Sequence, residues 1–539
     1  MTLYSKFEMK SAGMVLTSPS GKLITLEAFE SQPIEITYDD RGGEDVKASG
    51  EPEKLVRFFP DEVGIYRYDG GEFEVTRGDL RGYVKVSGDD PRYFAFSDGS
   101  SYCPVGMNLA FISPFGKSDG KEFGRSGFRF LGLRQYERWL RACRENGVDL
   151  VRIWLGHEYF CPDTEEAGVL DGVQLSKLEA FFELARRYEI RVKLTVEQFR
   201  FFDYERVADS DSYSDDVFRK FNKRLHIGGK RCESPSEWLS DESFRAAWLY
   251  KIKELSKRFS GDPALFGIEL WNEMSCLPWK ETLEWNRIML PEVKKLFPRQ
   301  LVMNSLGSFD SKWSLAAYEE FPWELSEIKQ MHRYLDQGAA YEVCRESPIE
   351  LIRDGAGILA DGTKPFLVAE TGAVNDRHSG PFRYYPADHD GILFCDLVYT
   401  PLFVGAAGCG HIWHWDERYV ESKNLYRYYR PFKKLIGGVD FAREGFVPGV
   451  WENEDLIFLY LRGKSVTIGY LRNKSVNWRR VLRDLEAEVT VGAVIPLDFG
   501  APEVIKIRES ESARVKVRGG EIEVEGLLFG LLLRFQNMG

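Results

Sequence analysis

The sequence has 539 residues, of which 43% are hydrophobic and 14% aromatic, so it can bury a large core. A disordered chain, a fibrous protein and a single small binding module are thereby excluded. Asp and Glu outnumber Lys and Arg by 84 to 72, which gives a formal net charge of −12. This acidic balance argues against nucleic acid or an anionic membrane as the main partner and suits a neutral or cationic one.

No stretch reaches the roughly 18 uncharged apolar residues that a membrane-spanning helix needs, so we expect no membrane partner. The N-terminal residues lack an apolar run behind a basic start. This predicts a cytoplasmic protein, or a secreted one if a leader was trimmed from the sequence. The eight cysteines show neither a C-x-x-C pair nor zinc-like spacing, and we interpret them as buried free thiols.

Residues 1–92 alternate short apolar runs with turn signals such as Asp69-Gly70-Gly71, which predicts a small β-sandwich-like domain. Its strands are expected at residues 34–38, 55–59, 64–68 and 82–86. A hairpin is expected next, with residues 93–96 and 102–105 on either side of Asp98-Gly99.

From about residue 100, short apolar runs alternate with long amphipathic helices, as repeated βα units require. Strands are expected at residues 102–108, 149–154, 191–197, 266–273, 300–305, 328–332, 365–370 and 410–415. Eight strands within residues 93–437 favour a (β/α)8 TIM barrel over an open doubly wound sheet, which usually has about five or six. No glycine-rich phosphate loop follows a strand, so we expect no nucleotide cofactor.

After residue 437 the helical pattern stops, and residues 438–539 are expected to form a small C-terminal β domain. Its strands are expected at residues 456–461, 465–470, 488–491, 504–507, 514–517 and 521–524. Residues 478–482 include Arg479 and Arg480 and are interpreted as a solvated charged turn rather than a binding patch.

The active site of a (β/α)8 barrel lies at the carboxyl ends of its strands, where polar residues that end an apolar run become candidates. Glu273 ends the predicted fourth strand and Glu370 ends the seventh. These strands lie across the barrel mouth from each other, so the two carboxylates could flank one bound molecule. Glycoside hydrolysis needs such a pair, one to protonate the leaving oxygen and one to attack the anomeric carbon. A neutral carbohydrate substrate also fits the acidic balance.

The run GDPALFGIELWNEM (261–274), with Trp-Asn-Glu at a strand end, resembles the acid/base motif of clan A glycoside hydrolases, most nearly the cellulase-like family 5. KPFLVAETG (364–372) resembles the nucleophile strand of that family, and HIWHWD (411–416) resembles its tryptophan-bearing eighth strand. The resemblance covers residues 93–437. The flanking β domains are similar to those of bacterial and archaeal members with an N-terminal sandwich.

The resemblance implies a retaining β-glycosidase in which Glu273 is the general acid/base and Glu370 is the nucleophile. Glu273 would have to keep its proton at the working pH, and Glu370 would have to stay ionised. Arg152, which ends strand two, resembles the arginine beneath the nucleophile. Tyr334 resembles the tyrosine that hydrogen-bonds the nucleophile, and Asn272 is placed to bind a sugar 2-hydroxyl.

Other residues at strand ends are candidates for sugar binding or support. They are Asn108, Trp154, His157, Glu197, His332, Trp413 and Trp415, with Trp271 as a further stacking platform. Glu197 stands near the end of strand three, where many family members have a histidine. His411 and His414 with Asp416 could suggest a metal, but residues i and i+3 of a strand point to opposite faces, so no metal is expected.

The favoured function is an exo-acting retaining β-glycosidase on gluco-, manno- or galacto-type oligosaccharides or glycosides. An endo-β-1,4-glycanase of the cellulase or mannanase kind is the first alternative, and transglycosylation by the same residues is another. A barrel that binds carbohydrate without cleaving it is the alternative from a different class. Such a protein is expected to lack one of the two carboxylates, whereas both are present here.

Overall fold

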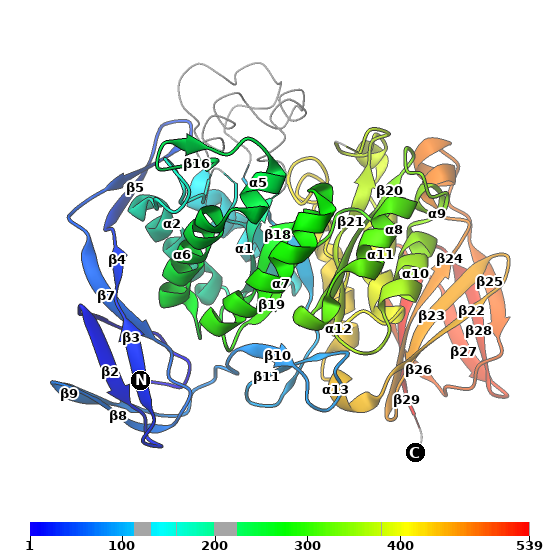
Figure 1. Ribbon diagram of the computed structural model, residues 1–539. Coiled ribbons are helices and arrows are strands. Elements are labelled where there is room, and N and C mark those ends of the chain that lie inside the picture. The colour runs from blue at the N-terminus through cyan, green and yellow to red at the C-terminus, as the bar shows by residue number, and fades with distance from the viewer. Residues whose placement is uncertain (113–130, 158, 199–223, 379, 538–539) are drawn as a thin grey trace.

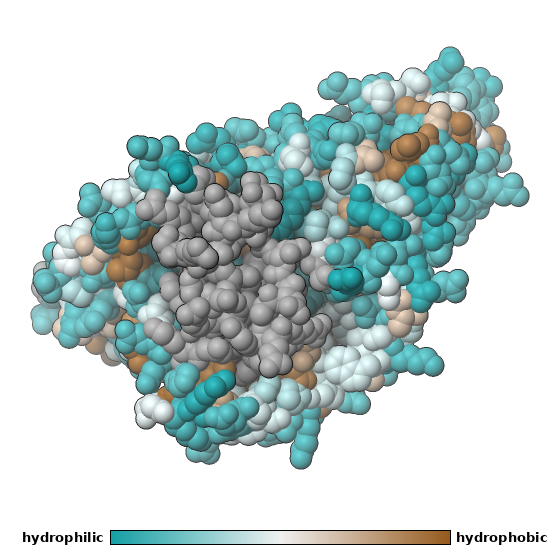
Figure 2. Space-filling model, turned by 90° about the horizontal axis from the view of Figure 1, so that it is seen from above, coloured by the Kyte–Doolittle hydropathy of each residue, from teal (hydrophilic) through white to brown (hydrophobic). Residues whose placement is uncertain are grey.

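The computed structural model describes residues 1–112, 131–157, 159–198, 224–378 and 380–537. Figure 1 shows antiparallel sheets at both ends of the molecule, with helices and parallel strands between them. Seen from above in Figure 2, most of the described surface is hydrophilic, and hydrophobic residues occur in small groups. Among the described residues, no helix has both the length and the apolar character needed to cross a bilayer.

The N-terminal strands pair antiparallel. They are β1 (Phe7–Lys10), β2 (Gly13–Thr17), β3 (Leu23–Glu27), β4 (Phe29–Ser31), β5 (Ile34–Tyr38), β6 (Glu44–Ala48), β7 (Glu53–Phe58), β8 (Gly64–Tyr68), β9 (Gly71–Val75), β10 (Val84–Val86), β11 (Phe94–Phe96) and β12 (Ser101–Tyr102). They form sheets in the orders β1-β7-β4, β3-β2-β8-β9, β5-β6 and β10-β11-β12. The predicted strands are confirmed, β5 and β8 with the predicted bounds and the others with shifted ends, whereas β1–β4, β6 and β9 were not anticipated.

The central strands are β13 (Gly106–Asn108), β14 (Leu150–Trp154), β15 (Arg191–Gln198), β18 (Leu265–Asn272), β19 (Leu301–Met303), β20 (Lys329–Asp336) and β21 (Phe366–Val374). The first five pair parallel in chain order, and β20 pairs parallel with β21. A parallel bridge from Ser308 to His332 joins the two sheets. Bridges from Ile412 to Met107 and to Thr371 lead back to β13, so the pairing runs round in a ring.

The expected eighth strand at residues 410–415 was wrong as a regular strand, because only Ile412 bridges its neighbours. His414 has a φ of 60°, which breaks the extended conformation. Gly410 packs so closely that an added Cβ would lie 2.3 Å from the carbonyl oxygen of Leu397. Backbone hydrogen bonds of His411 and Trp413 with Val368 and Thr371 nevertheless hold this segment beside β21.

Helices cover the central strands. They are α1 (Gly132–Asn146), α2 (Gly172–Arg187), α5 (Pro235–Ser240), α6 (Glu242–Phe259), α7 (Trp279–Leu296), α8 (Lys312–Glu320), α9 (Val343–Glu346), α10 (Pro348–Leu359), α11 (Ile392–Phe403), α12 (Tyr429–Ile436) and α13 (Phe441–Glu444). The predicted amphipathic stripes are confirmed: the apolar residues of α1, α2 and α6 at three- and four-residue spacing are buried. A two-stranded hairpin, β16 (His226–Ile227) and β17 (Lys230–Arg231), precedes α5.

The C-terminal strands are β22 (Val447–Glu452), β23 (Leu456–Arg462), β24 (Val466–Asn473), β25 (Val491–Ile495), β26 (Pro502–Lys506), β27 (Arg514–Arg518), β28 (Glu521–Leu527) and β29 (Gly530–Gln536). They form antiparallel sheets in the orders β22-β23-β24-β29-β26 and β25-β28-β27. Strands β22 and β29 were not predicted. The prediction of a solvated turn at residues 478–482 was wrong, because these residues lie in a helical segment. Trp478 is buried there, with its ring centroid 5.4 Å from that of Phe382.

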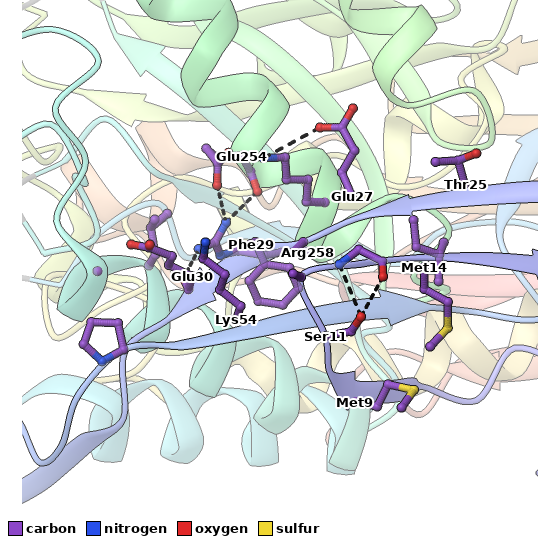
Figure 3. A pocket seen from close by; sticks show the side chains of 18 of the residues that line it. Met9, Ser11, Met14, Thr25, Glu27, Phe29, Glu30, Lys54, Glu254 and Arg258 are labelled. Atoms are coloured by element: carbon purple, nitrogen blue, oxygen red, sulfur yellow. Dashed lines mark hydrogen bonds and ion pairs between the residues drawn. The ribbon is translucent and has the colours of Figure 1, made fainter. Parts of the chain in front are cut away.

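A groove of about 1090 Å³ separates the N-terminal sheets from α2 and α6. In Figure 3, Glu254 and Arg258 approach it from the helix side, whereas Met14, Glu27 and Phe29 approach it from the strands. Glu254 and Arg258 form an ion pair of 3.1 Å. An ion pair between Arg57 of β7 and Glu179 of α2, with N···O at 2.5 Å, connects the N-terminal strands to the helices.

Candidate active site

Glu370 lies in β21 with its carboxylate nearly buried and held on both oxygens. The Tyr334 hydroxyl donates to Oε2 at 2.6 Å, and the Arg152 guanidinium donates to Oε1. Tyr334 belongs to β20, which continues to Asp336, beyond the predicted end at residue 332. A cation and a hydroxyl donor thus hold the Glu370 carboxylate in place through separate oxygens.

Glu273 follows β18 directly, with a φ of 57° in the left-handed region that residues other than glycine seldom adopt. Its Oε1 lies 3.0 Å from Nδ1 of His332, and that nitrogen lies 3.4 Å from Oε2 of Glu370. One carboxylate oxygen of Glu273, one of Glu370 and a ring nitrogen of His332 lie within 4.8 Å of one another. The two carboxylates thus face each other across His332. Backbone strain of this kind is characteristic of functional sites.

Arg152 of β14 is fully buried and connects several of the predicted residues. Besides Glu370, its guanidinium donates to Oδ1 of Asn272 at 2.6 Å and to Oδ1 of Asn108 at 3.2 Å. It also donates to Oε1 of Glu269, from Nε at 3.0 Å. Arg152 therefore fixes Asn272, Asn108 and Glu370 relative to one another.

Asn108 has no exposed surface, which is inconsistent with direct sugar contact. Its side-chain amide donates to the carbonyl oxygens of Ala369, His411 and Ile412 at 3.1–3.3 Å. Asn108 thus supports the site by joining β13 to β21 and to the Ile412 segment.

Beneath Arg152, sequence reasoning missed Lys193 and Gln330. The Lys193 ammonium lies 2.9 Å from Oε2 of Glu269 and donates to Oε1 of Gln330 at 2.8 Å. Burial opposes ionisation of Glu269, but Arg152 and Lys193 together hold its pKa well below the usual range. A lysine inside an otherwise apolar strand, between Val192 and Leu194, was the signal that could have identified this cluster.

Of the predicted tryptophan platforms, Trp413 keeps part of its surface accessible, whereas Trp154 and Trp415 are each 2% exposed. The Trp413 ring centroid lies 5.4 Å from that of Trp154 and 5.1 Å from that of Trp415. Phe111, at 6.0 Å from Trp413, completes an aromatic cluster beside β13 and β14. His157 stacks on Phe111 at 4.7 Å and is almost fully buried.

Trp271 was wrong as a sugar platform, since it is fully buried among helices, 5.3 Å from Trp238 and 5.7 Å from Trp285. Glu269 and Asn272 both reach Arg152 although they are three residues apart. In a regular strand, side chains three residues apart point to opposite faces. Because Glu269 and Asn272 point to the same side, the alternation is broken between them, and Trp271 points toward the helix layer.

Glu197 does not present its carboxylate to a sugar site. It is 2% exposed and accepts from Arg224 at 2.5 Å and from Lys251. Lys251 also donates to Asp163 at 2.6 Å. The two charges on Glu197 and Asp163 are thus paired with cations from α6 and from the segment before β16, as a buried carboxylate requires.

The loop at residues 377–390, of which residue 379 lies outside the described part, contributes His378 next to the site. His378 of this loop lies 2.8 Å from Asp336 through Nδ1 and 2.9 Å from Ser308 through Nε2. Burial opposes its protonation, but Asp336 and Glu273 raise the pKa of His378 above its ordinary value. Its ring meets the edge of Tyr334 at 5.5 Å, so the loop contacts the Glu370 side of the site.

No protein-family model and no curated protein matches this sequence. Among solved structures, a candidate glycoside hydrolase from Bacteroides vulgatus is 13% identical, with 99% of each chain covered and a TM-score of 0.53. A family 5 mannosidase from Rhizomucor miehei is 16% identical over 62% of this chain and 86% of its own, with a TM-score of 0.41. An endo-1,4-β-D-mannanase from Thermotoga petrophila is 18% identical over 62% of this chain and 100% of its own, with a TM-score of 0.41. Over nearly its whole length, this chain therefore shares the fold of the Bacteroides vulgatus protein.

Proposed function

We propose that this protein is a retaining β-glycoside hydrolase, with Glu370 as nucleophile and Glu273 as general acid/base. Residues 93–437 would form its (β/α)8 catalytic barrel between β domains at residues 1–92 and 438–539. The observation that carries the proposal is the approach of the Glu273 and Glu370 carboxylates to within 4.8 Å. Retaining glycosidases hold their two carboxyl groups about 5 Å apart, whereas inverting enzymes need room for a water between them.

The environments of the two carboxylates support this division of roles. Glu370 receives donors on both oxygens and is 4% exposed, so it suits a fixed anion that attacks the anomeric carbon. Glu273 has a more accessible side chain, at 14%, and lies beside the ring of His332. A group that first gives its proton to the leaving oxygen and later takes one from water needs this access.

His332 can serve both carboxylates in turn, because its Nδ1 lies 3.0 Å from Glu273 and 3.4 Å from Glu370. When Glu370 forms the glycosyl ester, its charge is lost and Glu273 becomes the anion. An N–H at Nδ1 then stabilises the newly ionised Glu273. Asn272, held by Arg152, is placed for the sugar 2-hydroxyl.

Tyr334→Phe is expected to lower kcat/KM by about 10- to 100-fold, since a hydrogen bond to a charged group contributes about 1.5–3 kcal/mol. Steady-state kinetics on an aryl β-glycoside measure this loss. Tyr419→Phe is the matched control, because it removes a buried 2.5 Å hydrogen bond to Asp388 away from Glu370. Equal losses in the two variants would contradict a specific role for Tyr334.

An exo-acting enzyme on short gluco-, manno- or galacto-type substrates is proposed over an endo-glycanase. Among the described members of the aromatic cluster at the strand ends, Trp154 and Trp415 are buried and Trp413 is half-buried. A single partly accessible ring suits one sugar unit better than a long polymer. The presence of both carboxylates weighs against a barrel that only binds carbohydrate.

The proposal is tested with nitrophenyl β-glucoside, β-mannoside and β-galactoside, followed by NMR of the first product. Hydrolysis of at least one substrate with initial release of the β-anomer is expected. Initial release of the α-anomer would contradict the retaining mechanism. Inactivity on this panel and on β-glucans and β-mannans would contradict the enzymatic function and favour a binding protein.

A further inference from the structure

Lys193 lies on β15 and has no exposed surface. Its ammonium group lies 2.9 Å from Oε2 of Glu269 on β18 and 2.8 Å from Oε1 of Gln330 on β20. The Gln330 amide in turn donates to the same Oε2 of Glu269 at 2.7 Å. Lysine is rarely buried in this way, and a carboxylate and an amide oxygen as its two partners favour the charged form.

Lys193 is connected to Glu370 through three ion pairs in series, Lys193–Glu269, Glu269–Arg152 and Arg152–Glu370. Glu269 contacts Lys193 through Oε2 and Arg152 through Oε1. Arg152 contacts Glu269 and Glu370 through different guanidinium nitrogens. Cations and carboxylates therefore alternate from Lys193 to Glu370, and their formal charges cancel. If Lys193 were uncharged, the cluster would carry one excess negative charge beside Glu370.

We propose that Lys193 is a positioning residue that offsets the charge of Glu269, so that Arg152 remains available to keep Glu370 ionised. This inference rests on the proposed function, because it takes Glu370 as the nucleophile. Lys193 touches neither Glu370 nor the space between the two carboxylates, so its effect passes through Glu269 and Arg152 and through the electrostatic field.

The groups around Lys193 support a charged lysine at the pH values where glycosidases act. Burial lowers the pKa of Lys193 to about 8, while Glu269 and Glu370 oppose this fall and Arg152 adds to it. Below pH 8, Lys193 is therefore mostly a cation. His411, which the charge of Lys193 also affects, is kept neutral because burial lowers the pKa of that ring well below its ordinary value.

The test compares pH profiles of kcat/KM for wild type, Lys193→Met, Glu269→Gln and the double variant. Lys193→Met should move the acid limb to higher pH by about one unit, because a favourable charge near the nucleophile is lost. Glu269→Gln should move it to lower pH. The double variant restores neutrality and should return the limb toward that of wild type.

Lys251→Met is the matched control, because Lys251 is also buried between two carboxylates, Asp163 and Glu197, but has no contact with Arg152 or Glu370. It should leave the acid limb in place. If Lys193→Met does not fold, the comparison of Glu269→Gln with the double variant isolates the same effect. The proposal would be overturned if Glu269→Gln and the double variant had the same acid limb in their pH profiles. It would also be overturned if Lys193→Met had the same acid limb as wild type.

A second measurement needs no substrate and separates this inference from the proposed function. Thermal melting is followed against pH for Glu370→Gln and its parent, in backgrounds with Lys193 and with Met at position 193. In each background, the difference in melting temperature between Glu370→Gln and its parent changes with pH. The midpoint of that change reports the ionisation of Glu370. That pH should be higher by about one unit in the Met background. An unchanged value would refute the role of Lys193, even if the protein proved not to be a glycosidase.

Discussion

Glu370→Ala is expected to reduce kcat on an active aryl β-glycoside by about 10³-fold or more, because the covalent route is lost. The shortened side chain leaves space where the carboxylate stood between Arg152 and Tyr334. Added azide should occupy this space, attack the anomeric carbon directly and restore turnover. The product should be the α-glycosyl azide, since one displacement inverts the configuration.

Glu370→Gln is the matched control, since it removes the nucleophile but fills the same volume. It should be as inactive as the alanine variant and should not respond to azide. Mass spectrometry and NMR of the azide product provide the measurement. Wild-type rates in Glu370→Ala, or a β-azide from it, would show that Glu370 is not the nucleophile.

Glu273→Ala is expected to give the second largest loss, and the loss should depend on the leaving group. For a substrate with a poor leaving group, kcat/KM should fall by about 10²- to 10⁴-fold, the usual contribution of general acid catalysis. For dinitrophenyl glycosides, which leave without protonation, the glycosylation step should be nearly unaffected. Azide should then attack the glycosyl-enzyme and yield the β-glycosyl azide.

The comparison of kcat/KM across a series of aryl glycosides measures this dependence. Asp310→Ala is a suitable control, because it removes a partly exposed carboxylate from the group that Asp310 forms with Asp336 and His378. It should not change how the rate varies with the leaving group. A uniform loss across the series in Glu273→Ala would contradict the acid/base role.

The sequence was sufficient to predict the alternation of parallel strands and amphipathic helices, because both follow from local hydrophobic periodicity. It also placed Glu273 and Glu370 at or near strand ends. Glu370 lies within β21, which continues to Val374, and Glu273 lies one residue beyond β18. Strand ends depend on where pairing with a neighbour stops, which local patterns do not encode.

Other predictions failed because they depended on packing between distant segments. Trp271 was expected to be a stacking platform, but it is buried against Trp238 and Trp285 of the helix layer. Glu197 was expected to line a sugar site, and its pairing with Lys251 and Arg224 depends on where α6 and the segment before β16 dock. Charge alone does not show which partner a buried carboxylate meets.

The sequence by itself determined the repeated strand-helix pattern and the two glutamates that could act on one sugar, since these follow from residue order and chemical type. The resemblance also implied that Arg152 and Tyr334 approach Glu370, but only the tertiary structure decided that His332 contacts both glutamates and that Lys193 lies beneath Arg152. Arg152 comes from β14, Lys193 from β15 and both His332 and Tyr334 from β20, and contacts within the site join residues 36 to 218 positions apart in the chain. Such proximity arises from the closing of the parallel strands into a ring, which no local pattern of residues records.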